Sequence, residues 1–274
     1  MAYETSGTAK TTRQSPTDEK ITVDNWDNPT LQNLVNDNGT LRLAETATIP
    51  DSAIYRWAYG SGSGSTATDS IGNADGTING ATWNSGTWIK DYALDGNGTD
   101  SYVSTTGLGD FGTTVMNGSH AIAFTMKSSD ITSSSSLFGT SNSSGRPSFW
   151  IDSGQSGTGG NIEVFNRGAS SGGVRLATDN TFDDGNPHRV VINYSSQSAS
   201  GIDIYVDTNS ETFTTVTDDH DGTFEDFANP FLHFARYNGG AEAFANVTLD
   251  DIIIFNDTLN STQRQDDYDR QPWS

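Results

Sequence analysis

Residues 186–211 read "NPHRVVINYSSQSASGIDIYVDTNSE" and contain two β-like runs separated by a Ser-rich stretch. In the second run Ile202, Ile204 and Val206 lie two residues apart, so they share one face of an extended strand and form its inward side. From Ile54 onward the chain repeats this design, with short β-like runs between clusters of Gly, Ser, Asn and Asp. The pattern predicts an all-β sandwich or barrel.

The two ends of the chain depart from this pattern. Residues 1–50 begin with a polar, aromatic-poor stretch and continue as a small β-rich connector, so we expect an N-terminal arm or docking segment there. Residues 51–274 are expected to form one β domain. Near its end, residues 261–270, "STQRQDDYDR", predict a short helix that Ser261 or Thr262 can cap.

Acidic residues outnumber basic ones in the 274-residue chain, 35 against 14, which gives a formal net charge of -21. A charge of this size repels nucleic acid and anionic membranes, so we expect neither as a partner. Lysine occurs only at positions 10, 20, 90 and 127, and aspartate far exceeds glutamate. Such a surface stays hydrated in molar salt, so we interpret the source as a halophile; the alternative is an ordinary acidic protein.

The sequence has no cysteine, which excludes disulfides and thiolate metal sites. Its first 20 residues lack the apolar segment of a secretory signal peptide. No apolar run approaches the roughly 18 residues that a membrane helix needs, so we do not expect membrane insertion. We expect a protein that folds where it is made.

Residues 246–255, "NVTLDDIIIF", place Asp250 and Asp251 directly against the most apolar run of the chain. In a regular strand the odd-numbered positions from 247 to 255 share one face and the even-numbered positions share the other. One of the two carboxylates must therefore lean toward buried surface. An ionised carboxylate there needs a cation, a salt-bridge partner or several hydrogen-bond donors, because unpaired burial costs several kcal/mol or more.

Four stretches, taken in order, are similar to the features of one family: an opening Trp strand with an Asp-Ser-x-Gly-Asn turn, an "FDG…DYV" hairpin, a "WHHVAVTYD…LYVDG" hairpin, and a closing "GxIDEVRIYNRALS" strand with a short helix. The four stretches are residues 55–83, 91–103, 186–211 and 231–265. Over roughly residues 51–274 the chain therefore resembles the laminin-G-like members of the concanavalin A-like jelly-roll superfamily.

Two departures from the family pattern concern the subfamily rather than the fold. Pro187 and His188 stand where the family has a paired Trp and His, and Leu94 stands where it has the Phe of "FDG". The resemblance implies a two-sheet antiparallel jelly-roll β-sandwich with a short C-terminal helix. It also implies a concave face, which carries sugar or protein ligands in many relatives.

A structural Ca²⁺ is a further implication of the resemblance. Asp250 matches the aspartate of the closing strand that binds this ion in related jelly rolls, and Asp69 in the Asp-Ser-x-Gly-Asn turn is the expected partner. Asp75 and Asp251 complete the candidate ligands, since Ca²⁺ takes six to eight oxygen ligands. The alternative is that the two adjacent aspartates are solvated or paired with an arginine such as Arg236.

Aromatic side chains that can stack on the apolar face of a sugar are the candidates for ligand binding, with Arg and Asn beside them. The candidate ligand-binding residues are Trp150, Phe165, Arg167, Tyr237 and Asn238. The alternative for most aromatic residues is a place in the core, and for Trp57 and Trp83 we expect the core.

Catalytic motifs do not support an enzyme. Gly168–Gly172, "GASSG", matches the nucleophile elbow and Gly107–Gly112, "GLGDFG", matches the dinucleotide fingerprint, but both lie between β-like runs instead of at a strand-to-helix turn. The four histidines show no metal-ligand spacing. The E-x-D-x-x-E strand of glycosidases with a related jelly roll is absent. We therefore expect a protein that is not an enzyme.

The leading hypothesis is a binding or adhesion module on the virion surface of a virus that infects a halophilic archaeon, such as a tail-fibre or spike protein. Its partners would be a host-surface glycan or glycoprotein and other virion subunits, and it would form a homo-oligomer. It would be assembled in the cytoplasm. One alternative is a structural capsid or tail decoration protein without sugar binding; others are a polysaccharide-active hydrolase and an extracellular adhesin.

Overall fold

The computed structural model describes residues 9–15, 18–23, 34–37, 40–43, 49–86, 91–108, 115–129, 131, 135–142, 144, 147–153, 159–169, 172–220 and 230–271. The chain divides into two compact units, Met1–Thr48 and Ile49–Ser274. Two antiparallel hairpins are described in the first unit, where the sequence predicts an arm. They are β1 (Ala9–Ser15) with β2 (Asp18–Val23), and β3 (Leu34–Asp37) with β4 (Thr40–Leu43).

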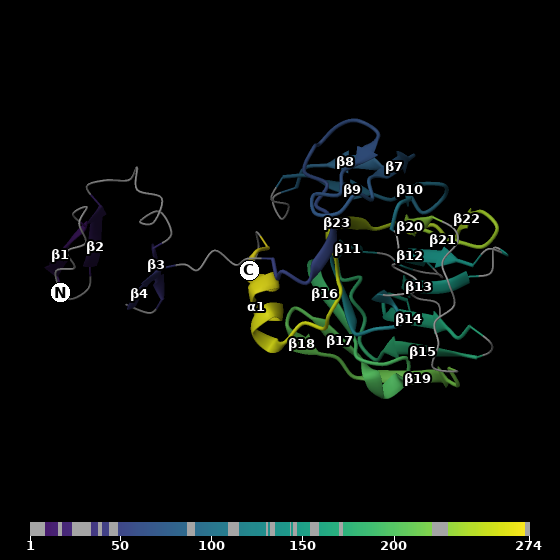
Figure 1. Cartoon of the computed structure of the whole chain (residues 1–274). Coiled ribbons are helices and arrows are strands. Elements are labelled where there is room, and N and C mark those ends of the chain that lie inside the picture. Colours follow the sequence, from purple (N-terminus) through teal and green to yellow (C-terminus); the bar gives the residue numbers. More distant parts are fainter. Residues whose placement is uncertain are drawn as a thin grey trace. The chain divides into compact units, whose positions relative to one another are not determined.

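The second unit is a sandwich of two antiparallel sheets (Figure 1), which confirms the fold expected from the sequence. The larger sheet has nine strands. In spatial order they are β19 (Phe213–Asp218), β15 (Gly173–Thr178), β14 (Ile162–Arg167), β13 (Pro147–Ser153), β12 (Ser135–Ser141), β20 (Phe231–His233), β10 (Tyr102–Thr105), β7 (Gly76–Asn79) and β6 (Thr66–Ala67).

The second sheet has eight strands, of which seven form a continuous order and one, β5, pairs with β23 beside that order. In order they are β18 (Asn209–Ser210), β17 (Ile202–Val206), β16 (Pro187–Tyr194), β11 (His120–Lys127), β23 (Thr248–Phe255), β9 (Ala93–Asp95) and β8 (Thr82–Asn84), with β5 (Ala53–Trp57). The remaining elements are the hairpin β21 (Arg236–Tyr237) with β22 (Ala241–Glu242), a 3-10 turn (Ala199–Gly201) and helix α1 (Ser261–Asp269).

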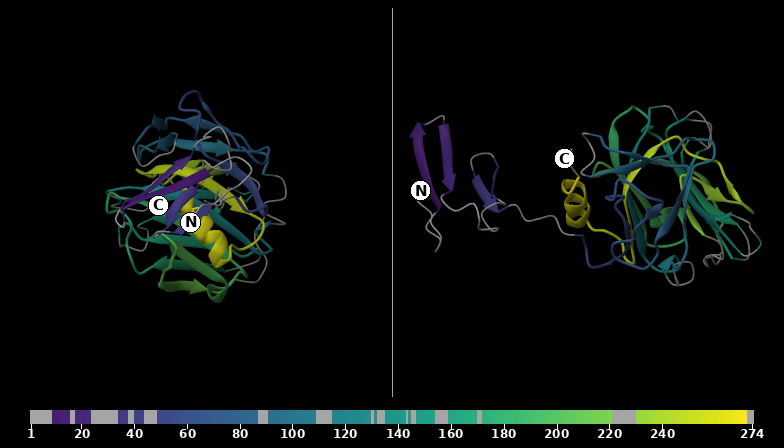
Figure 2. Two further views of the ribbon diagram at one scale, coloured as in Figure 1. Left: turned by 90° about the vertical axis from the view of Figure 1, so that its left-hand side faces the viewer. Right: turned by 90° about the horizontal axis from the view of Figure 1, so that it is seen from above.

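Figure 2 gives two further views of the ribbon. An apolar core lies between the two sheets. Ile122, Phe124 and Met126 of β11 alternate into this core, as the period of two in their sequence requires. Phe124 packs edge to face on Phe138 of β12, with the ring centroids 4.9 Å apart, so the two sheets are in direct contact. Strands β16 and β17 pair antiparallel, and Ile204 of β17 lies in the core as predicted.

The two tryptophans expected in the core differ in depth. Trp57 is fully buried, and its Nε1 donates to the carbonyl oxygen of Ala74 at 2.8 Å, which confirms the prediction. Trp83 on β8 is partly buried and packs against the core, while its Nε1 donates to the carbonyl oxygen of Gly64 at 3.0 Å.

Helix α1 begins after Asn260, whose side chain accepts from the backbone N–H of Gln263 at 3.0 Å. The Gln263 side chain in turn accepts from the N–H of Asn260 at 2.9 Å, which completes a capping box. The prediction of Ser261 or Thr262 as the cap was therefore wrong, because these residues already form the start of the helix and Asn260 occupies the cap position. Within the described residues, no helix has the length and apolar character needed to cross a membrane.

Candidate functional site

A β-bulge lies at the acidic pair of β23. Ala123 of β11 pairs with Ile253, but Thr125 pairs with Asp250, so β23 has one residue more than its partner over this step. Asp251 adopts a left-handed backbone conformation with φ of 43°, which is unusual for a residue with a side chain. The extra residue reverses the inward and outward positions along the strand.

Burial on β23 follows this reversal. Leu249 lies in the main core together with Ile252 and Ile254, whereas Ile253 and Phe255 belong to the smaller apolar cluster on the other face of the eight-stranded sheet. The prediction that the odd-numbered positions from 247 to 255 share one face was therefore wrong. Its cause is the single inserted residue, since a shift of one position moves every following side chain to the opposite face.

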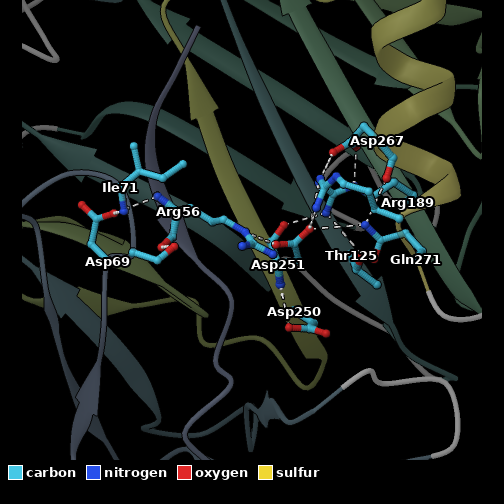
Figure 3. Close-up of polar contacts among 11 residues, drawn as sticks. Arg56, Asp69, Ile71, Thr125, Arg189, Asp250, Asp251, Asp267 and Gln271 are labelled. Carbon is cyan, nitrogen blue, oxygen red and sulfur yellow. Dashed lines mark hydrogen bonds and ion pairs between the residues drawn. The ribbon is translucent and has the colours of Figure 1, made fainter. Parts of the chain in front are cut away.

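Arginines compensate Asp251. Arg56 donates to its carboxylate at 2.7 Å, and Arg189 lies 3.5 Å from it (Figure 3). Arg270 lies 3.1 Å from the same carboxylate. Burial by itself would raise the pKa of Asp251, but the three guanidinium groups outweigh it and hold the pKa well below its ordinary value. Of the compensating partners expected from the sequence, salt bridges are thus the ones that Asp251 has. The arginines involved are Arg56, Arg189 and Arg270, not Arg236.

Helix α1 is attached to the sheet by the same cluster. Arg189 of β16 is fully buried and donates from Nε and Nη2 to the two carboxylate oxygens of Asp267, at 2.6 Å and 2.8 Å. Its Nη1 donates to the carbonyl oxygen of Asp251 at 2.6 Å. A two-pronged pair of this kind is both strong and directional, so it fixes where the helix lies on the sheet.

Asp69 supports the backbone of its own turn. Its carboxylate is largely buried and accepts four backbone N–H groups at 2.9 to 3.1 Å, from Arg56, Ile71, Gly72 and Ala74. Asp75 accepts the N–H of Asp69 at 2.8 Å. Asp69 in the Asp-Ser-x-Gly-Asn turn and Asp75 just after it therefore both stabilise the segment that precedes β7.

Asp250 lies apart from the arginine cluster in Figure 3, and its carboxylate accepts the backbone N–H of Asp251 at 2.7 Å. It is 6% exposed, and burial, followed by the charge of Asp251, raises its pKa to about 7. Within the described ranges no group of three His, Asp or Glu side chains gathers as a metal site. A calcium site at Asp69, Asp75, Asp250 and Asp251 stays a prediction. It depends on Asp250, because Asp69 and Asp75 accept backbone N–H groups and Asp251 is paired with arginines.

A second cluster occupies the face of the nine-stranded sheet that points away from the core. We call it the outer row; its members are Trp150, Asp152, Glu163, Phe165, Arg167, Arg175 and Arg236. Trp150 of β13 and Phe165 of β14 are paired in register and stack with ring centroids 3.8 Å apart. The guanidinium of Arg236 lies over Trp150 at 5.4 Å, and that of Arg167 lies over Phe165 at 5.1 Å. Three residues expected to bind ligand, Trp150, Phe165 and Arg167, are thus brought together.

Gly139 of β12 makes room for this arrangement. It is the register partner of Trp150, and a Cβ added to it would lie 2.6 Å from the Cβ of Arg236. Only a glycine lets the arginine pass over β12 and reach the indole. Arg236 of β21, which lies over Gly139 of β12, and Phe165 of β14 therefore flank Trp150 on its two sides.

Two buried carboxylates continue the outer row, and the sequence analysis did not find them. Asp152 of β13 and Glu163 of β14 are direct register partners, so their side chains share one face. Asp152 accepts from the hydroxyl of Ser136 and from Nη1 of Arg236, the latter at 3.2 Å. Glu163 Oε1 accepts from Nε and Nη2 of Arg175, both at 2.6 Å.

Burial raises the pKa of Asp152 to about 7, although the hydrogen bond from Ser136 and the charge of Arg236 act in the opposite direction. Two buried polar atoms of the row have no hydrogen-bond partner among the described residues: the indole nitrogen Nε1 of Trp150 and the carboxylate oxygen Oε2 of Glu163. The period of two could have revealed the carboxylates, because Asp152 follows Trp150 by two residues and Glu163 precedes Phe165 by two.

The other expected ligand-binding residues lie at the β21–β22 turn. Asn238 is exposed, and its side chain donates to Glu242 at 3.2 Å, the carboxylate that also accepts from Arg236 at 3.0 Å. The side chain of Tyr237 lies outside the described residues, as do positions 109–112 of the "GLGDFG" match. The "GASSG" match joins the antiparallel strands β14 and β15, which confirms that it connects a hairpin.

Comparisons with known proteins bear on the fold. No protein-family model matches the chain, and no curated protein is significantly similar to it in sequence. Among solved structures, the receptor-binding domain of botulinum neurotoxin C/D mosaic serotype is similar with a TM-score of 0.59 at 14% identity, covering 80% of this chain and 51% of that one.

Two further structures give the same result. The binding domain of Paraclostridial Mosquitocidal Protein 1 has a TM-score of 0.60 at 11% identity, covering 81% of this chain and 52% of that one. A Trypanosoma rangeli sialidase in complex with 2,3-difluorosialic acid has a TM-score of 0.55 at 14% identity, covering 81% and 33%. The chain thus spans about half the length of the toxin domains and a third of the sialidase, and the likeness shows a β-sandwich fold.

Proposed function

We propose that the sandwich unit is a non-enzymatic glycan-binding module and that the outer row is its binding site. The observation that carries the proposal is the pair of buried, unpartnered polar atoms, Trp150 Nε1 and Glu163 Oε2, beside stacked aromatic rings. A buried polar group without a partner costs about 1–3 kcal/mol, so a ligand that supplies both partners recovers that free energy on binding. Sugars bring many hydroxyl groups, and proteins bind them through aromatic, arginine and carboxylate side chains.

The fold supports the same proposal. One of the similar solved structures is the binding domain of botulinum neurotoxin DC in complex with SialylT, with a TM-score of 0.58 at 16% identity over 81% of this chain. Because fold does not determine function, the side chains of the outer row are the main support for glycan binding.

We further propose that the module acts on the virion surface of a virus infecting a halophilic archaeon, where it contacts host-surface glycans or glycoproteins and assembles with other virion subunits as a homo-oligomer. The net charge of -21 and the scarcity of lysine support the saline setting. A decoration protein without sugar binding is the alternative that the following experiment distinguishes.

The test is a glycan array in molar potassium chloride, with the wild-type chain and a Trp150→Ala variant whose folding is checked by circular dichroism. We expect binding by the wild type and a loss of at least tenfold in the variant, because the ring stack and the indole N–H are removed together. The control is Trp83→Ala on β8, in the other sheet, which should bind as the wild type does. A wild type that binds no glycan refutes the proposed function.

A second candidate function rests on one observation. Asp152 and Glu163 are direct cross-strand neighbours, and retaining glycosidases place their two carboxyl groups about 5 Å apart. With its raised pKa, Asp152 is suited to donate a proton and Glu163 to act as nucleophile. Their arginine partners and deep burial favour the binding role. Release of reducing sugar by the wild type, abolished in Asp152→Asn, would reverse this order.

A further inference from the structure

The two unpartnered atoms of the outer row are placed to meet a common ligand group. Trp150 is the register partner of Phe165, and Glu163 is the register partner of Asp152, so Trp150 and Glu163 are diagonal neighbours on one face of β13 and β14. Diagonal neighbours in an antiparallel pair lie roughly 7–8 Å apart at Cα, within reach of long side chains. Within the part of the chain that the structure describes, the indole N–H and the carboxylate oxygen Oε2 form no hydrogen bond with each other or with another group.

Their chemistry selects the group that fits. Trp150 Nε1 can only donate, and an ionised Glu163 can only accept. A hydroxyl group accepts from the first and donates to the second at the same time. A ligand carboxylate would accept from Trp150 but meet the negative charge of Glu163, and an ammonium group would satisfy Glu163 but leave the indole N–H without an acceptor.

The charges of the outer row also favour an uncharged ligand. Arg236 is paired with Asp152 and Glu242, and Arg175 is paired with Glu163. A sugar carboxylate that bound either of these two arginines would have to displace an existing ion pair. The side chains of Arg175 and Arg236 are 25% and 19% exposed, so the row is reached by solvent at both ends while its centre stays buried.

We infer that the outer row binds an uncharged, hydroxyl-bearing sugar unit, with one hydroxyl bridging Trp150 Nε1 and Glu163 Oε2, in preference to sialic or uronic acid units. The inference rests on the proposed glycan-binding function and names its ligand class. It separates this chain from the sialidase structure in complex with sialic acid and from the toxin-domain structure in complex with SialylT, which share the fold.

The experiment uses the full chain on an array in molar salt that carries matched pairs, such as lactose and sialyllactose, and neutral oligosaccharides with their uronic acid counterparts. We expect signals for neutral members and at least tenfold weaker signals for their acidic partners. Trp150→Phe, which keeps the ring stack and removes only the N–H, should weaken binding about fivefold. Glu163→Gln should weaken it by at least tenfold, and Trp83→Phe, the matched control, should not change it.

The outcomes separate the two proposals. Signals confined to acidic glycans overturn the ligand class and leave the glycan-binding function standing. Wild-type affinity in both Trp150→Phe and Glu163→Gln overturns the bridging hydroxyl. The absence of any glycan signal, with the fold retained, overturns the glycan-binding function itself, and a water molecule would then be the partner of the two atoms.

Discussion

Asp250→Asn is the substitution that tests how β23 tolerates its second carboxylate. Asp250 is 6% exposed, and among the hydrogen bonds of the described residues its carboxylate accepts one, from the N–H of Asp251. The asparagine side chain has the same shape, its oxygen can accept the same hydrogen bond, and it carries no charge. The substitution therefore removes the cost of ionising a buried carboxyl and little else.

The size of the effect follows from the pKa. Burial, together with the charge of Asp251, raises the pKa of Asp250 from 3.8 to about 7. Each unit of difference between folded and unfolded pKa is worth about 1.4 kcal/mol, so ionised Asp250 lowers the free energy of unfolding by up to about 4 kcal/mol. The folded state holds this proton more tightly, so the stability is present below pH 4 and is lost as the pH rises toward 7 and above.

The prediction is tested by measuring the free energy of unfolding in urea at pH 4, 6 and 8, in molar salt with EDTA. We expect wild type and Asp250→Asn to agree at pH 4 and the variant to become more stable as the pH rises, with a gain of up to about 4 kcal/mol at pH 8. Asp203→Asn, at an exposed position of β17, changes the net charge equally and serves as the control.

A variant less stable than the wild type at pH 8 in EDTA would refute the reasoning, because it would mean that the ionised carboxylate is compensated by the protein. Repeating the series in calcium chloride tests the predicted ion. If Ca²⁺ binds at Asp250, added calcium stabilises the wild type at pH 8 and the variant loses that gain. Equal stability of the wild type in calcium and in EDTA would contradict the predicted calcium site.

Three further predictions concern the fold and its surface. Asp267→Asn removes the two-pronged ion pair of the buried Arg189 and leaves it, among the described residues, only the longer ionic contact with Asp251 at 3.5 Å, so we expect a loss of roughly 3–5 kcal/mol in urea denaturation, and a loss below about 1 kcal/mol would contradict the role of this pair. Thr208→Gly should raise Tm and stabilise the fold by about 0.5–1 kcal/mol, because Asp207 and Thr208 both have positive φ in the turn between β17 and β18; a lower Tm would speak against it. Tm should also rise from low to molar salt, as the net charge of -21 is screened, and equal values would count against the halophilic interpretation.

Local sequence was sufficient to predict the β-strands and many of the residues that form the core. The spacing of Ile202, Ile204 and Val206 fixed which side of β17 is buried, because side chains alternate strictly along an extended chain. The same rule placed Ile122, Phe124 and Met126 inside. The rule holds wherever a strand is regular, and most strands of the sandwich are.

Tertiary structure decided where that rule fails and which distant groups meet. One extra residue at Asp251 reversed the faces of β23, and a bulge depends on the partner strand, not on the strand's own pattern. Asp251 meets Arg56 from 195 positions away, and Glu163 lies beside Asp152 only because β13 and β14 pair in one register. Periodicity describes a segment alone, whereas ion pairs and unpartnered polar atoms arise between segments, so the folded chain is needed to find them.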